Sequence, residues 1–314
     1  MLNRLSLSRR APGVAVALGV FVAASLLVLA PARASAQSSQ LRGQNIAPVF
    51  EGWEKNTDGS FNLVFGYFNR NWEEEADVPV GPDNSLSPGV PDQGQPTHFQ
   101  PRRNRFVFRV RVPRDFGKKE VVWTLTTHGR TERAYGTLNA DYFIDDIVIM
   151  NNMGGAGAAG GGNDTLDNKP PALRVEGEGT RRTKIGQPVA LTAYATDDDG
   201  KPRRVAMPSP AIRARASNGG NGGTPNAATG LRTSWFVYRG AGTVTFDPPQ
   251  VETWEDHRDG ANSPWAAGFT TPPTPPGGKW DVHATFSTPG TYVLRCLTSD
   301  GALLVSQDVT VVVE

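Results

Sequence analysis

Three consecutive aspartates, Asp197, Asp198 and Asp199, form with Gly200 the turn best suited to bind a metal ion in this 314-residue sequence. Calcium takes several oxygen ligands from carboxylates and carbonyls, and an Asp-rich turn supplies both. Three adjacent side chains cannot all point the same way, however, and the D-x-D-x-D-G spacing of a calcium-binding loop is absent. The turn therefore has two interpretations, a calcium site and a solvated connection between strands.

A second group of ionisable residues lies in the segment VETWEDHRDG, residues 251–260. The side chains that could build a metal site or a catalytic carboxylate pair are Glu252, Glu255, Asp256, His257 and Asp259. Zinc sites usually need more His or Cys than this segment offers, and the chain has only four histidines in all. We expect a charged loop that Trp254 and Trp265 pack onto the protein.

The segment Pro101–Lys119 carries six arginines and two lysines against one aspartate. Phe106 and Phe108 share the parity expected of core residues, so their rings are not free to stack on nucleic-acid bases. The arginines expected on the outward face of this strand are Arg105, Arg109 and Arg111. This positive face either binds an anionic surface or polysaccharide, pairs with Glu73–Glu75, or protects the strand from edge-to-edge aggregation.

The sequence contains no local motif of a serine hydrolase, a zinc protease or a phosphate-binding loop. This removes any positive argument for an enzyme without excluding one. A hydrolase would need two carboxylates at a suitable separation to act as acid and base. The candidates in the N-terminal part are Glu73, Glu74, Asp141 and Asp145.

Gly155, Gly157 and Gly160 spell G-x-G-x-x-G directly after an apolar run, as in a dinucleotide-binding turn. Such a site needs a helix that begins within the glycines and holds the pyrophosphate at its N-terminus. The next residues, GGNDTLDNKPP, have no apolar periodicity and end in two prolines. We therefore predict a flexible linker over residues 151–171, halves that move independently, and no cofactor other than the candidate calcium ion.

The first 36 residues have the pattern of a signal peptide that is removed on export. Arg4, Arg9 and Arg10 precede an uncharged apolar run, and an Ala-Ser-Ala triplet then ends at Ala36. An uncleaved membrane anchor is the alternative, because about twenty apolar residues can just span a bilayer. Cleavage removes four arginines and changes the net charge from +1 to −3. The mature chain then has no transmembrane segment and no bulk attraction to nucleic acid.

The secondary-structure elements that carry these candidate residues are expected to be strands, because apolar residues after position 36 alternate with a period of two. A hairpin is predicted around the turn Asn56–Gly59, a long polar loop over 72–104, and a strand over 142–150, with no helix. The chain is thus predicted to be all-β, with two antiparallel β-sandwich-like domains. The expected parts are a flexible start at 37–44, domains at 45–150 and 172–314, and insertions in the second domain at 201–230 and 248–278.

The second domain contains WFVYRGAGTVTF and FSTPGTYVLRCLTSDGALLVSQDVTVVV. Both segments resemble bacterial PKD-like and other immunoglobulin-like β-sandwich domains, although the W-x-F-G-D-G signature of typical PKD domains is missing. The resemblance implies a sandwich core with Trp235, Tyr292 and Cys296, and with Leu191 near the place of the absent first cysteine. Cys296 is the only cysteine, so no intrachain disulfide can form. We expect it to be a buried core residue, the alternative being a reactive thiol.

These observations predict an exported, non-catalytic binding or structural module of the bacterial cell envelope or exterior. Its location would be the periplasm, the outer surface or the medium, and its partner a cell-envelope protein or polysaccharide. The immunoglobulin-like scaffold by itself does not specify a function, because it serves many. The alternative is an exported hydrolase with a catalytic N-terminal domain and an accessory immunoglobulin-like domain.

Overall fold

The computed structural model describes residues 41–154, 167–207, 209 and 227–314, all of which belong to one compact unit, Gln40–Glu314. The expected signal peptide (1–36) lies outside the described residues, as do 37–40, the glycines of the G-x-G-x-x-G segment, and most of the 201–230 insertion. Within the described part, strands predominate, which confirms an all-β chain. No helix there has the length and apolar character needed to cross a membrane.

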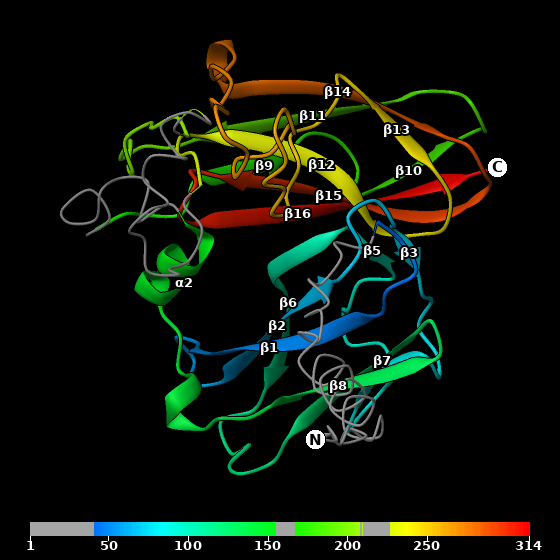
Figure 1. The fold of residues 1–314 in the computed structure, drawn as a ribbon, viewed down its shortest axis with the longest axis vertical. Coiled ribbons are helices and arrows are strands. Elements are labelled where there is room, and N and C mark those ends of the chain that lie inside the picture. Colours follow the sequence, from blue (N-terminus) through cyan, green and yellow to red (C-terminus); the bar gives the residue numbers. More distant parts are fainter. Residues whose placement is uncertain (1–40, 155–166, 208, 210–226) are drawn as a thin grey trace, which may run out of the picture. The chain divides into compact units, whose positions relative to one another are not determined.

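The N-terminal half, residues 41–154, contains two three-stranded antiparallel sheets and one short strand pair (Figure 1). The first sheet has the order β1 (Ile46–Lys55), β2 (Phe61–Asn69), β6 (Arg102–Val112). The second has the order β4 (Asn84–Ser87), β7 (Val121–Thr127), β8 (Arg130–Gly136). The short pair joins β3 (Ala76–Asp77) to β5 (His98–Phe99). Three of these strands lie within residues 72–104, so the prediction of one long loop there was wrong.

The hairpin predicted at the start of this half is confirmed by the pairing of β1 with β2. Its turn is closed by a hydrogen bond from the Asn56 backbone N–H to the Ser60 carbonyl, and Gly59 has φ +85°. The core below it is aromatic: Phe65 stacks on Phe108 at 5.3 Å, and the edge of Trp123 meets Phe108 at 4.9 Å. Rings of this size account for much of the apolar burial in the half.

A bulge in β6 separates the two phenylalanines that the sequence pattern assigned to one core. Phe65 pairs with Phe108 and Tyr67 with Asn104, so three residues of β6 lie opposite one residue of β2. Phe106, at the middle of this bulge, has φ +53°. The side chain of Phe106 therefore enters a different cluster from that of Phe108, which corrects the predicted parity.

A helix, and not the predicted strand, follows the last strand of this half. The short 3-10 turn η1 (Ala140–Tyr142) leads to α2 (Asp146–Met153). The side chain of Asp145 caps α2 by accepting a 3.0 Å hydrogen bond from the Val148 N–H, and Gly154 ends the helix with φ +83°. Ile149, Met150 and Met153 are buried on one side, which is the spacing of a helix face.

The C-terminal half is a sandwich of two four-stranded sheets, drawn in green to red in Figure 1. The first sheet has the order β13 (Val244–Asp247), β14 (Lys279–Phe286), β11 (Val189–Thr196), β9 (Ala172–Val175). The second has the order β10 (Thr180–Thr183), β16 (Leu304–Val313), β15 (Gly290–Ser299), β12 (Arg232–Arg239). A 3-10 turn, η2 (Pro276–Gly278), precedes β14. This strand order matches that of immunoglobulin-like sandwiches.

The residues expected in the core of that sandwich are buried. Trp235, Cys296 and Leu191 are all buried in one cluster, with Trp235 opposite Cys296 in neighbouring strands. Burial raises the pKa of the Cys296 thiol, which makes it a packing residue and a poor nucleophile. The hydroxyl of buried Tyr292 donates 2.8 Å to the Ala241 carbonyl and thereby ties the start of β15 to an earlier turn.

A third hydrophobic cluster, which we call the junction core, contains residues of both halves. Val64 and Phe106 come from the first sheet, Met150 and Met153 from α2, and Trp265 from the 248–278 segment. Trp254 and Trp265 are both buried, as predicted for anchors of that segment. Because the two halves share this core, the structure differs from the expected pair of independently moving domains.

Candidate functional site

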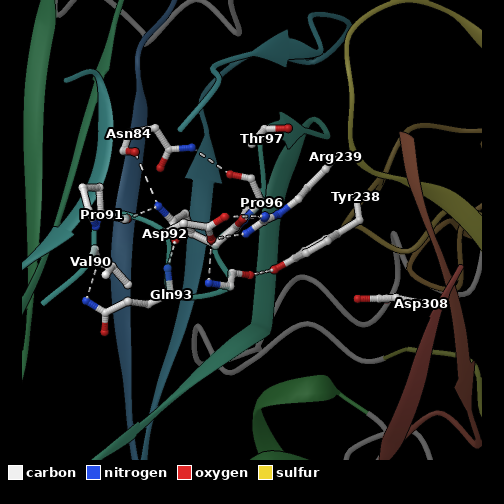
Figure 2. A network of polar contacts seen from close by, with 12 residues as sticks. Asn84, Val90, Pro91, Asp92, Gln93, Pro96, Thr97, Tyr238, Arg239 and Asp308 are labelled. Atoms are coloured by element: carbon white, nitrogen blue, oxygen red, sulfur yellow. Dashed lines mark hydrogen bonds and ion pairs between the residues drawn. The ribbon is translucent and has the colours of Figure 1, made fainter. Parts of the chain in front are cut away.

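Polar contacts join the loop 91–97 of the N-terminal half to the end of β12 (Figure 2). The guanidinium of Arg239 donates two hydrogen bonds to Asp92, at 2.8 and 2.9 Å, and a third, at 2.9 Å, to the Gln95 carbonyl. The Tyr238 hydroxyl donates 2.5 Å to the Gly94 carbonyl. The Arg239 hydrogen bonds lower the pKa of Asp92, so the bidentate pair is charged at neutral pH.

The loop is also fixed from its other side, by amide side chains. Buried Asn84 donates to the carbonyls of Val78 and Pro96, at 2.9 and 2.8 Å, and Gln95 donates 2.7 Å to Pro91. These bonds help to satisfy backbone oxygens beside the junction, and the Pro91 carbonyl also accepts 3.1 Å from the Leu86 N–H. The loop therefore presents its carbonyls to β12 in a preset geometry.

A groove of about 550 Å³ lies beside this contact. One wall is β6 at Val107–Arg109, and another is formed by Tyr238 and Arg239 of β12. Side chains of β15 and β16, among them Arg295 and Ser306, complete the lining. The groove thus exists only because the two halves are held together, and its shape depends on the contacts of the loop 91–97.

Arg295 organises the base of the groove. It forms a bidentate ion pair with Asp308, at 2.7 and 2.8 Å, and donates 2.6 Å to the Val107 carbonyl of β6. Its guanidinium carbon also lies 3.5 Å from the centroid of the Tyr238 ring. Burial raises the pKa of Tyr238 to about 12, so its hydroxyl remains a donor. Arg295 therefore connects the two halves through its hydrogen bond to Val107, and it also makes a cation–π contact with Tyr238.

Strand β6 has a free edge along the groove. It is the last strand of its sheet, with β2 on one side only. Because the Val107 carbonyl bonds to Arg295 and faces away from β2, the backbone groups of Arg109 and Arg111, two and four residues on, also face away from β2. Backbone groups of Arg109 are therefore available at the groove, and those of Arg111 farther along the same edge, without a neighbouring strand among the described residues.

A smaller cavity of about 60 Å³ continues from the groove into the junction. Aromatic side chains of both halves, including Tyr67 and Phe236, line it together with Arg103 and His98. Arg103 donates to both carboxylate oxygens of Glu51, each at 2.7 Å. Burial raises the pKa of Glu51 although Arg103 acts to lower it, so this ion pair depends on its close geometry.

His98 is held between two carboxylates at the edge of this cavity. Its Nδ1 lies 2.8 Å from Asp77, its Nε2 lies 3.1 Å from Glu75, and the side chain is only 8% exposed. Burial alone would lower the pKa of His98, but the hydrogen bonds and charges of Asp77 and Glu75 raise it to about 9. Both ring nitrogens then donate, and the imidazolium clamps β3 against β5.

The raised pKa of His98 gives a pH-dependent stability. Its contribution is fully present below pH 6.5, the ordinary value, and is lost as the pH rises through about 9. The expected loss over that range is about 3 kcal/mol, from 1.36 kcal/mol for each pKa unit. Urea unfolding between pH 6 and 9.5 should show this loss in the native chain and in the control variant His283→Gln, because His283 is exposed, but not in His98→Gln. Parallel curves for all three proteins would refute it.

The three arginines predicted as an anionic-ligand face each have a carboxylate partner within the chain. Arg105 pairs with Glu255, and Arg111 with Asp58. Arg109 donates to Glu54 at 2.8 and 2.9 Å. Arg105 is mostly buried because the β6 bulge turns it into the junction, whereas Arg111 is exposed. None of them pairs with Glu73–Glu75, so that interpretation of the charges was wrong.

The candidate calcium turn is an acidic network with internal partners. Asp199 accepts backbone hydrogen bonds from Lys169 and Lys201, at 2.8 and 2.9 Å, while Asp198 is exposed. Burial, then the hydrogen bond with Asp199 and the charge of Asp300, raise the pKa of Asp197 to about 7. Across the described residues, no group of three or more His, Cys, Asp or Glu is arranged to hold a metal ion.

The VETWEDHRDG segment forms ion pairs across the junction. Asp256 is fully buried and binds Arg258 through two oxygens, and Arg258 also lies 3.7 Å from Glu73. Burial, then the charge of Asp256, raise the pKa of Glu252 to about 7. The segment is thus charged and anchored, as predicted, and two of its charges, Glu255 and Arg258, lie against Arg105 and Glu73 of the N-terminal half.

The carboxylates proposed for a hydrolase have separate roles. Glu74 accepts from the Gly43 N–H and contacts His128 at 2.7 Å, Glu73 is near Arg258, and Asp145 caps α2. The described structure therefore gives three of the four carboxylates different neighbours, and the fourth, Asp141, is exposed.

The groove residues Asp92, Tyr238 and Arg295 were not singled out from the sequence. Tyr238 and Arg239 lie in the WFVYRG segment, where an aromatic ring next to an arginine on an edge strand is a signal for an interface. Asp92 gives no such signal, because its partner is 147 positions away.

Comparisons with known proteins do not assign a family. No family model matches the chain, and no curated protein does. A chimeric titin Z1Z2 carrying a decorin peptide is 10% identical over 86% of this chain and 98% of that chain, with a TM-score of 0.21. The Yersinia pseudotuberculosis adhesin InvE is 11% identical over 87% and 60%, with a TM-score of 0.21. The D0-D1 domain of intimin is 12% identical over 84% and 97%, with a TM-score of 0.20. Scores this low carry no argument, so the immunoglobulin-like assignment rests on strand order.

Proposed function

We propose that this chain is an exported, non-catalytic binding module of the bacterial cell envelope or exterior. Its ligand is an extended segment of an envelope polypeptide that lies in the groove and adds to the free edge of β6. The single observation that carries this proposal is the free edge of β6, which lines a groove of about 550 Å³ at Val107–Arg109. Strand addition of this kind obtains affinity from main-chain hydrogen bonds and specificity from flanking side chains.

The charges around the groove favour a polypeptide over a polysaccharide. Arg295 with Asp308 and Arg239 with Asp92 place both signs of charge along the walls. Tyr238 and the aliphatic side chains of Val107 and Val293 also line the groove. A strand with alternating apolar and charged side chains matches this pattern, whereas a uniform polyanion would meet the two aspartates.

The proposal is tested with peptides selected on the mature chain, residues 37–314, from a random decapeptide display library. Ser306 is exposed, lines the groove and has room for a larger side chain only if the groove is empty. Ser306→Arg should therefore weaken the selected peptides by at least about tenfold, which corresponds to 1.4 kcal/mol. Methylation of alternate peptide amides should have a similar effect, because it removes the donors that strand addition needs.

Thr245→Arg is the matched control, since Thr245 is exposed on β13, in the other sheet of the sandwich. It should leave binding unchanged. Equal affinities for both arginine variants, insensitivity to amide methylation, or binding of envelope polysaccharide in place of peptides would each contradict the proposal.

A further inference from the structure

A second surface, away from the groove lining, exposes large apolar side chains. Seven large apolar side chains are strongly exposed in the described residues, and three of them fall within six positions. These are Tyr142 (50%), Phe143 (48%) and Ile147 (53%). Half-buried Trp53 lies beside them, with its ring centroid 5.0 Å from that of Phe143. We call these four residues the aromatic surface. Clusters of this kind, when rimmed by polar residues, mark interaction sites.

The backbone holds the aromatic surface in place. The Ile144 N–H donates 3.0 Å to the Trp53 carbonyl, and the Trp53 indole N–H donates 2.7 Å to the Asn139 carbonyl. Gly52 has φ +140°, and a Cβ there would lie 2.5 Å from the Tyr142 carbonyl oxygen. The close approach of residues 142–144 to β1 therefore requires glycine. Rings fixed in this way lose little conformational entropy when a partner binds.

The ring geometry distinguishes between classes of partner. The planes of Trp53 and Phe143 are inclined by 61°, and those of Trp53 and Phe61 by 88°. Tyr142 is inclined by 67° to Phe50. Rings at such angles form a faceted surface and not a flat platform on which sugar rings could stack. Crevices between tilted rings instead accept the side chains of a polypeptide.

Acidic residues form the rim. Asp141, Asp145 and Asp146 are all exposed, and no ion pair is found for any of them among the described residues. The positive charge of Arg109 acts on Asp146, but the Arg109 guanidinium is already hydrogen-bonded to Glu54. The rim therefore keeps a net negative charge that a basic partner would complement.

We propose that the aromatic surface docks a basic segment of a partner polypeptide. Lysine or arginine side chains of that segment lie over the faces of Trp53 and Phe143, with their charged ends directed to Asp141 and Asp146. Its aliphatic side chains pack against Ile147. The contact uses no residue that lines the groove, so it is independent of the proposed peptide ligand there. A cation over an exposed aromatic ring and a complementary acidic rim each add modest affinity.

The test uses the mature chain and a fluorescent decapeptide of lysine, leucine and glycine, with glutamate replacing lysine in a matched peptide. The lysine peptide should bind, and Phe143→Ser should weaken it about fivefold, in line with the loss of one exposed cation–π contact and its apolar neighbours. The double variant Asp141→Asn/Asp146→Asn should weaken it to a similar degree and reduce its salt dependence. Asp145 is left unchanged because it caps α2.

Tyr135→Ser is the matched control, since Tyr135 is 53% exposed on β8, outside the aromatic surface. It should bind the lysine peptide as the native chain does. If Phe143→Ser proves unfolded by circular dichroism, Ile147→Ser replaces it, because Ile147 is slightly more exposed than Phe143 and lies on α2. Equal binding of lysine and glutamate peptides, equal binding by all variants, or a preference for oligosaccharides or for a second copy of the chain would overturn the proposal.

Discussion

Replacing Gly66 with alanine is expected to lower the free energy of unfolding by about 4 kcal/mol, the range seen when a buried ion pair is broken. Gly66 lies in β2 at the β6 bulge, where a Cβ would overlap Glu51 Oε1 and lie 2.5 Å from the Asn104 carbonyl oxygen. Both neighbours are fixed, because Glu51 holds Arg103 through two hydrogen bonds. The added methyl group must therefore displace either the ion pair or the strand.

Urea unfolding of residues 37–314 measures this effect, and Gly81→Ala is the matched control. Gly81 also lies in the N-terminal half, but a Cβ there has nothing within 4 Å and its φ is not positive. That variant should change stability by less than about 0.5 kcal/mol, as is usual for surface substitutions. Similar losses for the two variants would contradict the packing around Glu51.

Replacing Trp265 with alanine is expected to cost about 3–5 kcal/mol and to uncouple the two halves. Trp265 is 3% exposed and packs in the junction core with Phe106 and Met153. Its removal leaves a cavity between elements of different halves, while the core of each half keeps its own residues. Far-UV circular dichroism during urea unfolding should then show two transitions where the native chain shows one.

Trp280→Ala provides the comparison for this prediction. Trp280 is half-buried on β14, in the sheet that contributes nothing to the junction core. Its loss should lower stability by about 1–2 kcal/mol, less than for a fully buried tryptophan, and leave a single transition. Two transitions in this variant, or one in Trp265→Ala, would show that the junction core does not couple the halves.

The C-terminal sandwich was predictable because its core residues are close to one another in a repeating pattern. Tyr292 and Cys296 lie on β15, where buried and partly buried residues alternate, Trp235 lies opposite Cys296 on β12, and Leu191 belongs to the same cluster. Strand alternation fixes which face each residue takes, so the core follows from the pattern alone. The same reasoning succeeded for the hairpin of β1 and β2.

The prediction from sequence failed at two places, the β6 bulge and helix α2, where a local feature overrode the alternation of apolar residues. The β6 bulge puts Phe106 and Arg105 on the side opposite to their expected parity, and nothing in the sequence marks φ +53° at Phe106. Helix α2 was taken for a strand because Ile147, Val148 and Ile149 are typical of strands. The Asp145 cap and the burial of Met150 and Met153 decide in favour of the helix.

The groove could not have been predicted, because it depends on contacts between distant parts of the chain. Tyr238 and Gly94 are 144 positions apart, and Arg295 and Val107 are 188 apart. Judged by composition alone, a glycine-rich segment between two strand-rich halves suggests that the halves move independently. The junction core and the Arg239–Asp92 pair instead make the two halves parts of one structure.

Differential scanning calorimetry of residues 37–314 decides whether the junction is a fixed structure that couples the two halves. If the junction core and the loop 91–97 hold the groove together, residues 37–314 will unfold in one transition whose calorimetric and van't Hoff enthalpies agree. Two separable transitions, each with the enthalpy of one half, would show that the groove is not a fixed feature and would contradict the proposed binding site.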